Sequence, residues 1–238
     1  MIDIHSHILP NIDDGSRDME ESLTMITEAY ENGFTSIICT SHYLSDSYDC
    51  NKKDRERLIS ELQDKLVESG IDIKLYNGAE AYISMDLDEL IKDDVIPTLN
   101  GSRYVLFEVP MDTKVLFLEA VIDKLFAMKL IPILAHPERY SYMQENYSTY
   151  ETLNKKGVLF QANIGSIVGK HGSAAKKTVK KLLKNDMVSF LATDAHRASS
   201  LYIQTNEMLK TASKIVGRDK IEILTKINPE YILDNKII

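Results

Sequence analysis

Short apolar runs rich in β-branched residues alternate with longer amphipathic segments along most of the chain. The runs predict seven strands, at residues 2–4, 36–40, 71–76, 104–109, 131–135, 158–162 and 188–192. The intervening segments place apolar residues three to four apart and predict helices at residues 20–32, 54–69, 115–129, 174–185 and 199–216. Regular alternation of strand and helix is typical of a parallel sheet flanked by helices.

The number of these units favours an α/β barrel over an open sheet. Seven or eight strand and helix units in 238 residues suit a closed or nearly closed barrel, and a doubly wound open sheet is the alternative. No internal repeat, low-complexity tract or linker interrupts the pattern, so we expect one domain over residues 1–238. Both architectures place functional residues at the carboxyl ends of their strands.

Composition narrows the class of protein. The chain is 44% hydrophobic and 27% charged, and it has no apolar run of the 18 or so residues needed to cross a membrane. The opening Met-Ile-Asp-Ile-His does not fit a secretory signal. With 36 acidic and 28 basic residues the net charge is −8, so we expect no general electrostatic binding to nucleic acid. Cys39 and Cys50 are too few for a disulfide framework, which favours a reducing, cytoplasmic location.

Polar residues that can ligate metals follow six of the predicted strands. They are His5, His7, His42, Glu80, Glu108, His136, Asp194 and His196. Five of the six histidines of the chain are in this set, and only His171 lies outside it. Imidazole and carboxylate together are the ligand mixture that Zn²⁺, Mn²⁺ and Fe²⁺ accept. The sequence therefore predicts a metal centre at the carboxyl ends of the strands.

The spacing within this set supports convergence on ions. His5 and His7 are two residues apart on a strand, so both imidazoles project from one face, and Asp194 and His196 repeat the spacing. For His5 and His7 alone, the alternative is a pair of surface or strand-end histidines. Carboxylates at strand ends, such as Glu80 and Glu108, are costly to bury unless they are paired or bind a cation, and for either alone a buried ion pair or a contact with a helix N-terminus is the alternative to a metal.

Two further acidic positions have less specific interpretations. Asp13 and Asp14 precede Gly15 and a predicted helix, so Asp14 is a candidate ligand while turn formation and helix capping are the alternative, more strongly for Asp13. Asp3 is predicted to lie on the face of His5, one step deeper, where it would orient an imidazole.

The charge of the predicted site favours a phosphate substrate. Its four carboxylates are Asp14, Glu80, Glu108 and Asp194. Three divalent ions would leave the site at about +2 before any hydroxide binds, which suits a phosphate dianion attacked by a metal-bound hydroxide. Arg139 follows His136 by three residues and could hold a phosphoryl oxygen, with a surface salt bridge to Glu138 as the alternative.

Taken together, these motifs closely resemble one known family. They are Met1-Ile-Asp-Ile-His-Ser-His7, Asp13-Asp-Gly15, Thr40-Ser-His42, Gly78-Ala-Glu80, Pro97-Thr-Leu99, Arg103-Tyr104, Glu108, Ala135-His-Pro-Glu-Arg-Tyr140 and Thr193-Asp-Ala-His196. Over essentially the whole chain the sequence resembles the capsule and exopolysaccharide branch of the bacterial polymerase-and-histidinol-phosphatase (PHP) family. The resemblance implies a distorted seven-stranded α/β barrel of the PHP type and a manganese-dependent protein-tyrosine phosphatase that opposes an autophosphorylating tyrosine kinase.

The resemblance also implies how the ligands are shared among three divalent ions, Mn²⁺ by preference and Fe or Zn as alternatives. One ion is expected at His5, His7, Glu80 and Asp194. Glu80 would bridge to a second ion held by Glu108 and His136, and Asp14, His42 and His196 would bind the third. Arg139 corresponds to an arginine that contacts phosphate. Arg197 is assigned to a second phosphate contact although the family arginine lies several residues further on.

The predicted reaction is in-line attack of a metal-bridging hydroxide on phosphotyrosine. Thiol-based catalysis needs Cys-x5-Arg, which neither cysteine supplies. The expected substrate is the phosphotyrosine-bearing tail of a kinase, with no membrane insertion, although a membrane-associated kinase could recruit the protein. The alternatives are a small-molecule phosphatase such as histidinol-phosphate phosphatase, a phosphodiesterase, and a metal-dependent phosphoprotein binder without turnover.

Overall fold

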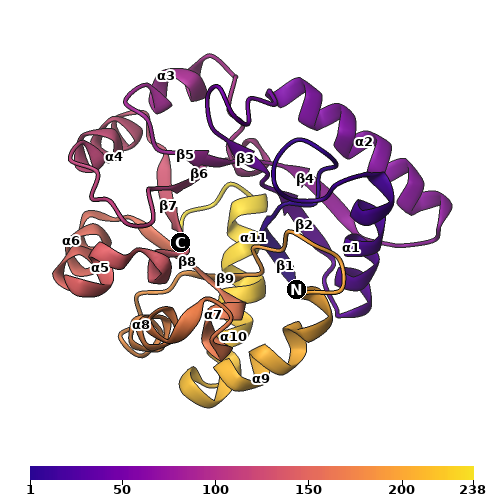
Figure 1. The fold of residues 1–238 in the computed structure, drawn as a ribbon. Helices are drawn as coiled ribbons and strands as arrows, with labels where there is room; N and C mark the ends of the chain where they lie inside the picture. The colour runs from indigo at the N-terminus through magenta and orange to yellow at the C-terminus, as the bar shows by residue number, and fades with distance from the viewer.

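The strands of the protein form two parallel sheets surrounded by helices (Figure 1). A computed structural model describes residues 1–238. One sheet has the order β1-β2-β4 and the other the order β3-β5-β6-β7-β8-β9. The strands are β1 (Ile2–Ser6), β2 (Ser36–Cys39), β3 (His42–Tyr43), β4 (Lys74–Asn77), β5 (Glu80–Tyr82), β6 (Tyr104–Glu108), β7 (Ile131–Ala135), β8 (Leu159–Asn163) and β9 (Phe190–Ala192).

The sheets confirm the predicted α/β class and parallel pairing. Each of the seven predicted strands is present, whereas the two short strands β3 and β5 were not predicted. β3 continues the chain of β2 after two residues, and β5 likewise continues β4. Because the pairing is interrupted at these two points, the ladders divide into sheets of three and six strands instead of one seven-stranded barrel.

The edges of the two sheets meet where β1 approaches the end of β9. The His7 amide donates to the carbonyl of Ala195 at 2.9 Å, and the Asp194 amide donates to the carbonyl of His5 at 2.8 Å. These bonds bring the predicted motifs at residues 5–7 and 194–196 side by side.

The helices lie mainly outside the strands, and α11 lies near the centre of the view in Figure 1. They are α1 (Met19–Glu31), α2 (Lys52–Glu68), α3 (Leu87–Lys92), α4 (Leu118–Ala127), α5 (Ser141–Glu145), α6 (Ser148–Lys156), α7 (Ile164–Val168), α8 (Gly172–Lys184), α9 (Thr205–Val216), α10 (Arg218–Glu222) and α11 (Asn228–Leu233). The five predicted helices are present, although α9 begins at Thr205, six residues later than expected. None of the helices is both long and apolar enough to cross a bilayer.

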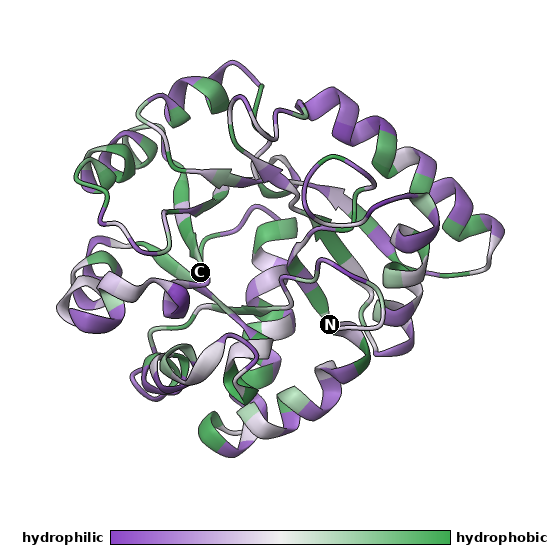
Figure 2. Cartoon of the chain, in the orientation of Figure 1, coloured by the Kyte–Doolittle hydropathy of each residue, from purple (hydrophilic) through white to green (hydrophobic).

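Two buried apolar clusters support the strands, and apolar segments accordingly run along the strands in Figure 2. The larger cluster, of 50 residues, includes the apolar faces of the surrounding helices. The smaller one, of 11 residues, joins Ile4, Leu106 and Phe190 of three strands to Ile232 of α11. These apolar residues precede the polar residues at the carboxyl ends of the same strands.

The β1–β2 pairing is irregular between Asp3 and Ser6, where its register shifts. Ile4 packs in the smaller cluster, while the next residue, His5, reaches Glu80 at 3.1 Å. Strict alternation would direct neighbouring side chains to opposite faces, and a register shift of this kind redirects side chains locally.

Candidate metal centre

All nine predicted ligands come together at the carboxyl ends of the strands. The imidazole nitrogens and carboxylate oxygens of eight of them form three overlapping groups, namely His5, His7, Glu80 and Asp194; His42, Glu80 and Glu108; and His7, Asp14, His42 and His196. Within each group these atoms lie within 4.8 Å of one another. His136 adjoins the second group, because its Nε2 lies 2.9 Å from Oε1 of Glu80.

The first group is buried in the protein. The Nε2 atoms of His5 and His7 lie 3.1 and 3.3 Å from Oε2 of Glu80, and each lies 3.4 Å from Oδ1 of Asp194. All four residues are buried. The four atoms therefore surround a common point, as ligands of one ion would.

Glu80 of the second group lies between His42 of that group and the adjoining His136. Nδ1 of His42 lies 3.0 Å from Oε2 of Glu80 and 3.0 Å from Oε1 of Glu108. Oε1 of Glu80 faces His136 instead. The two oxygens of Glu80 thus face different partners, which is the geometry of a carboxylate that bridges two ions.

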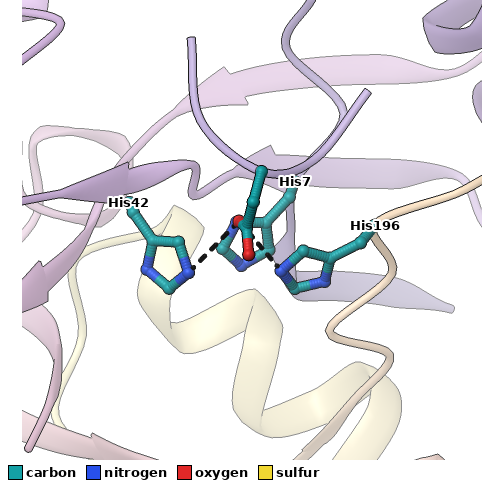
Figure 3. A group of neighbouring side chains, drawn as sticks. His7, His42 and His196 are labelled. Carbon is teal, nitrogen blue, oxygen red and sulfur yellow. Dashed lines mark ion pairs between the residues drawn. The ribbon is translucent and has the colours of Figure 1, made fainter. Parts of the chain in front are cut away.

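The third group is the one open to solvent. In Figure 3, His7, His42 and His196 converge on one carboxylate. This is Asp14, whose Oδ1 lies 3.5 Å from Nε2 of His42 and 3.4 Å from Nε2 of His196. The Asp14 side chain is 53% exposed and that of His196 is 29% exposed. A substrate can therefore approach the centre from this group.

The chemistry of the donor atoms fits divalent cations. Both oxygens of Glu80 and Nδ1 of His42 are buried, but their close contacts lack hydrogen-bond geometry, and Nδ1 of His136 is also buried without a hydrogen-bond partner. Such unsatisfied buried groups are costly. Burial opposes charge on the His42 ring, but the carboxylates of Glu80 and Glu108 outweigh it and raise the pKa of His42 to about 10. The raised pKa indicates that the electrostatic potential at His42 is strongly negative. The same potential would favour a bound metal cation.

Neighbouring side chains fix the orientation of the histidine rings. Nδ1 of His5 lies 2.8 Å from Oε1 of Gln161, and Nδ1 of His7 lies 2.8 Å from Oδ2 of Asp13. In both rings this leaves Nε2 facing the centre, since the tautomer is set by the bond at the other nitrogen. Asp13 also accepts the amide of His42 at 2.9 Å.

The structure corrects one prediction about these supporting residues. Asp3 does not orient an imidazole, because its carboxylate accepts hydrogen bonds from the hydroxyls of Thr193 and Tyr202 and from the amides of His5 and Thr193. The register shift after Asp3 explains the error, since regular alternation was assumed. Gln161 and Asn163 were not predicted, and Asn163 donates to Oδ2 of Asp194 at 2.6 Å. Their positions at the carboxyl end of a strand were the sequence signal that could have identified them.

The backbone is strained at two of the predicted ligands. His136 has φ 31° and Asp194 has φ 56°, which place both in the left-handed region that side chains other than glycine rarely adopt. Such conformations cost free energy and are found where a functional position requires them.

A buried arginine holds the loop that carries His42. Arg55 of α2 is fully buried and donates to the carbonyls of Ser41, His42 and Cys50 at 2.7–2.9 Å. Burial lowers the pKa of Arg55 from its ordinary value. This role was not predictable from sequence, because a basic residue in a charged amphipathic helix is usually exposed.

The two predicted phosphate contacts are placed differently. Nη1 of Arg139 lies 3.1 Å from Oδ2 of Asp194, so its guanidinium borders the metal centre. Nη1 of Arg197 donates to the carbonyl of Gly15 and lies 3.9 Å from Glu21.

A hollow of about 390 Å³ opens beside Asp194 and His196, and Arg197 lines it. Lys170 and His171 line the same hollow, so the histidine outside the predicted set nevertheless lies near the centre. Burial, followed by the neighbouring Arg139 cation, lowers the pKa of His171 to about 4.

Comparisons with known proteins agree on one family. The family model for capsular polysaccharide synthesis, CpsB/CapC, matches residues 1–234. The tyrosine-protein phosphatase YwqE of Bacillus subtilis is 31% identical over all of this chain and 93% of its own length. The tyrosine-protein phosphatase CpsB of Streptococcus pneumoniae is 29% identical over the full length of both chains.

Solved structures extend the likeness to three dimensions. A crystal structure from work on YwqE and CpsB, described as unique metal-dependent tyrosine phosphatases, superposes with a TM-score of 0.95 at 31% identity, covering 100% of this chain and 96% of that one. A histidinol phosphate phosphatase from Lactococcus lactis superposes with a TM-score of 0.61 at 14% identity, covering 94% and 96%, and indicates a shared fold.

Proposed function

Because this chain belongs to the CpsB/CapC family of capsular polysaccharide synthesis, we propose that it is a metal-dependent protein-tyrosine phosphatase. The observation that carries the proposal is the convergence of eight histidine and carboxylate residues in overlapping groups that could hold metal ions, with His136 against Glu80 and an arginine at their border. The family relatives with matching length are named tyrosine-protein phosphatases.

We propose three divalent ions, Mn²⁺ by preference. His5, His7, Glu80 and Asp194 would hold one ion, Glu80, Glu108 and His136 a second, and Asp14, His42 and His196 a third. His42 and His7 each belong to two of the groups in the structure, which supports adjacent ions that share a cluster. When bound, divalent ions supply Lewis-acid activation of water and of the phosphoryl group.

The chain's own residues would position the phosphoryl group. Arg139 presents its guanidinium at the edge of the centre and would hold phosphoryl oxygens, which arginine does with two parallel hydrogen bonds. Arg197, which lines the hollow beside Asp194 and His196, is the candidate for a second contact. The exposed edge at Asp14 and His196 is where the phosphotyrosine would enter.

We further propose that the two sheets together form a distorted barrel of seven strands, in a single domain over residues 1–238. Counting β2 with β3 and β4 with β5 gives seven continuous strands, and the bonds between residues 5–7 and 194–195 support contact between the first and the last. The proposed substrate is the phosphorylated tail of a tyrosine kinase of capsule synthesis, and the proposed location is the cytoplasm.

The test is phosphate release from a phosphotyrosyl peptide by protein stripped of metal, before and after addition of Mn²⁺, with His136→Ala beside the wild type. We expect Mn²⁺ to restore turnover in the wild type and not in the variant. Turnover that depends on neither would contradict the proposal. Faster hydrolysis of histidinol phosphate than of the peptide would instead favour a small-molecule phosphatase, whose fold the chain shares.

A further inference from the structure

A long segment that includes α8 carries positive charge without any acidic residue. Residues 152–185 contain eight of the 28 basic residues of the chain and none of its 36 acidic residues. The other 20 basic residues share the rest of the chain with all the acidic ones, so this segment differs sharply from the remainder of a protein of net charge −8.

Six of these lysines lie at the turn before α8 and along that helix, and we call them the α8 lysine face. They are Lys170, Lys176, Lys177, Lys180, Lys181 and Lys184. None of them makes an ion pair, whereas Lys156 of α6, in the same segment, contacts Glu119 and Asp123. Lys176 donates to the carbonyl of Val168, and Lys181 lies over the ring of Tyr147. The ammonium groups of the remaining four make no hydrogen bond within the protein.

The α8 lysine face begins at the proposed active site. Lys170 lines the hollow of about 390 Å³ that Asp194 and His196 also line. Its position is fixed by a hydrogen bond from its amide to the carbonyl of Gly165 at 3.1 Å, directly after α7. Two residues after Lys170, α8 begins at Gly172, and this helix carries the other five lysines of the face up to its last residue, Lys184.

The free lysines of α8 form one stripe. Lys177, Lys180 and Lys184 are three and four residues apart, a spacing that aligns side chains on one helix face, and the stripe is about 10 Å long at 1.5 Å per residue. An extended peptide covers such a distance with about three residues. A segment that enters the hollow with its phosphotyrosine could therefore place its neighbouring residues along the stripe.

We propose that the α8 lysine face binds acidic residues that flank the phosphotyrosine of the substrate, and so makes the enzyme selective for phosphotyrosine in acidic sequences. This inference rests on the proposed function for the reaction itself. Charge complementarity identifies the partner as anionic, and continuity with the hollow at His196 identifies it as part of the substrate chain.

An anionic membrane surface is the competing partner, and the composition of α8 disfavours it. Helices that lie on membranes insert large apolar side chains into the lipid. The apolar residues of α8, which are Ala175, Val179, Leu182 and Leu183, are all buried in the protein, and no large apolar residue of this helix is exposed.

The test compares binding of two peptides that carry a nonhydrolysable phosphotyrosine analogue. One has glutamate at alternate positions on both sides of the analogue, and the other has glutamine at the same positions. We expect the wild-type protein loaded with Mn²⁺ to bind the acidic peptide about tenfold more tightly in fluorescence anisotropy at low salt, which is the effect of several weak surface pairs acting together. The triple variant Lys177→Gln, Lys180→Gln, Lys184→Gln should reduce this preference to about twofold or less.

A matched variant controls for net charge. Lys53→Gln, Lys65→Gln and Lys92→Gln remove three lysines of α2 and α3, which also lack ion pairs and lie on the other side of the molecule (Figure 1). We expect this variant to retain the preference. Equal binding of the two peptides by the wild type, or an equal loss in both variants, would overturn the proposal.

Two further outcomes have distinct meanings. If the α8 variant lost binding to phosphatidylglycerol vesicles but kept its preference for the acidic peptide, the face would be a membrane contact and the proposal would be wrong. Because the assay measures binding without turnover, a protein that discriminates the peptides but does not hydrolyse phosphotyrosyl peptides would uphold this inference while contradicting the proposed reaction.

Discussion

The Nε2 atoms of His5 and His7 lie 3.1 Å apart in a site where both rings are buried. Both nitrogens also face Oε2 of Glu80, and the opposite ring nitrogen of each histidine is already bonded to Gln161 or Asp13. If both imidazoles are neutral, each Nε2 presents a lone pair to the other, and neither nitrogen can donate a hydrogen bond. A cation bound by both Nε2 atoms would remove this conflict.

Removal of metal should therefore destabilise the fold as well as stop catalysis. At a Mn²⁺ concentration about 100-fold above its dissociation constant, we expect the free energy of unfolding to exceed that of the stripped protein by about 3 kcal/mol. Urea unfolding with and without chelator measures the difference. Unchanged unfolding in a sample shown to bind Mn²⁺ would mean that the ion binds the folded and unfolded chains equally.

Asp13→Asn should weaken metal binding without unfolding the protein. The asparagine keeps the size of the side chain but loses the charge that Asp13 presents to Nδ1 of His7 at 2.8 Å. Supporting residues of this kind contribute about 10- to 100-fold in metal affinity. Titration with Mn²⁺ measures the loss, and Asp72→Asn at an exposed position is the control. Wild-type affinity in Asp13→Asn would show that the His7 ring is oriented without this bond.

Arg55→Ala should be among the most destabilising single substitutions in the protein. It would leave the carbonyls of Ser41, His42 and Cys50 without their donor and remove a buried side chain, so we expect a loss of about 3 kcal/mol. Arg57→Ala, two residues along the same helix, breaks only an exposed pair with Glu61 and should cost less than about 0.5 kcal/mol. Denaturant unfolding of both variants compares them, and similar losses would argue against the buried role of Arg55.

The predicted ligands were accessible from sequence because their positions follow a simple rule. His42, Glu80 and Asp194 each come after an apolar strand, and parallel strands place their carboxyl ends at one edge. Strand and helix periodicity was likewise sufficient for the seven main strands. These features depend on residues close together in sequence.

Features that depend on distant or irregular contacts were not predictable in this way. Arg55 reaches back 13 residues to the carbonyl of His42, and Gln161 bonds to His5 across 156 residues. The error about Asp3 came from a register shift that no local pattern indicates. The division into two sheets has a similar origin, since the short strands β3 and β5 lack an apolar run of their own.

His171 should make folding stability fall in mild acid. Burial and the nearby Arg139 cation lower its folded pKa to about 4, whereas the unfolded pKa is about 6.5. The unfolded chain therefore binds a proton in the window between these values, and stability decreases as the pH falls from 6.5 toward 4. Because the ring is partly exposed, we expect a contribution of about 1 to 2 kcal/mol.

His171→Gln provides the comparison for this effect. Glutamine can retain a hydrogen bond near Ser166, which contacts Nδ1 of His171 at 2.9 Å, but it does not titrate. The variant should show a flatter decline of the unfolding midpoint between pH 6.5 and pH 4 than the wild type. Parallel declines would assign the acid sensitivity to other groups.

Arg139→Ala should impair the reaction more than Arg197→Ala. The Arg139 guanidinium makes its ion pair with Asp194 at the centre itself, whereas that of Arg197 already donates to the Gly15 carbonyl. Loss of a charged contact to the phosphoryl group costs about 2 to 4 kcal/mol of transition-state stabilisation, or about 30- to 1,000-fold in kcat/KM. We expect a loss of that size for Arg139→Ala and a loss of less than tenfold for Arg197→Ala.

Arg139→Lys should recover only part of the rate, since lysine keeps the charge but not the paired donors. Steady-state rates with a phosphotyrosyl peptide at saturating Mn²⁺ decide the ranking. An equal loss in the two alanine variants would place both arginines on the phosphoryl group, and would require the Arg197 side chain to leave Gly15 when substrate binds.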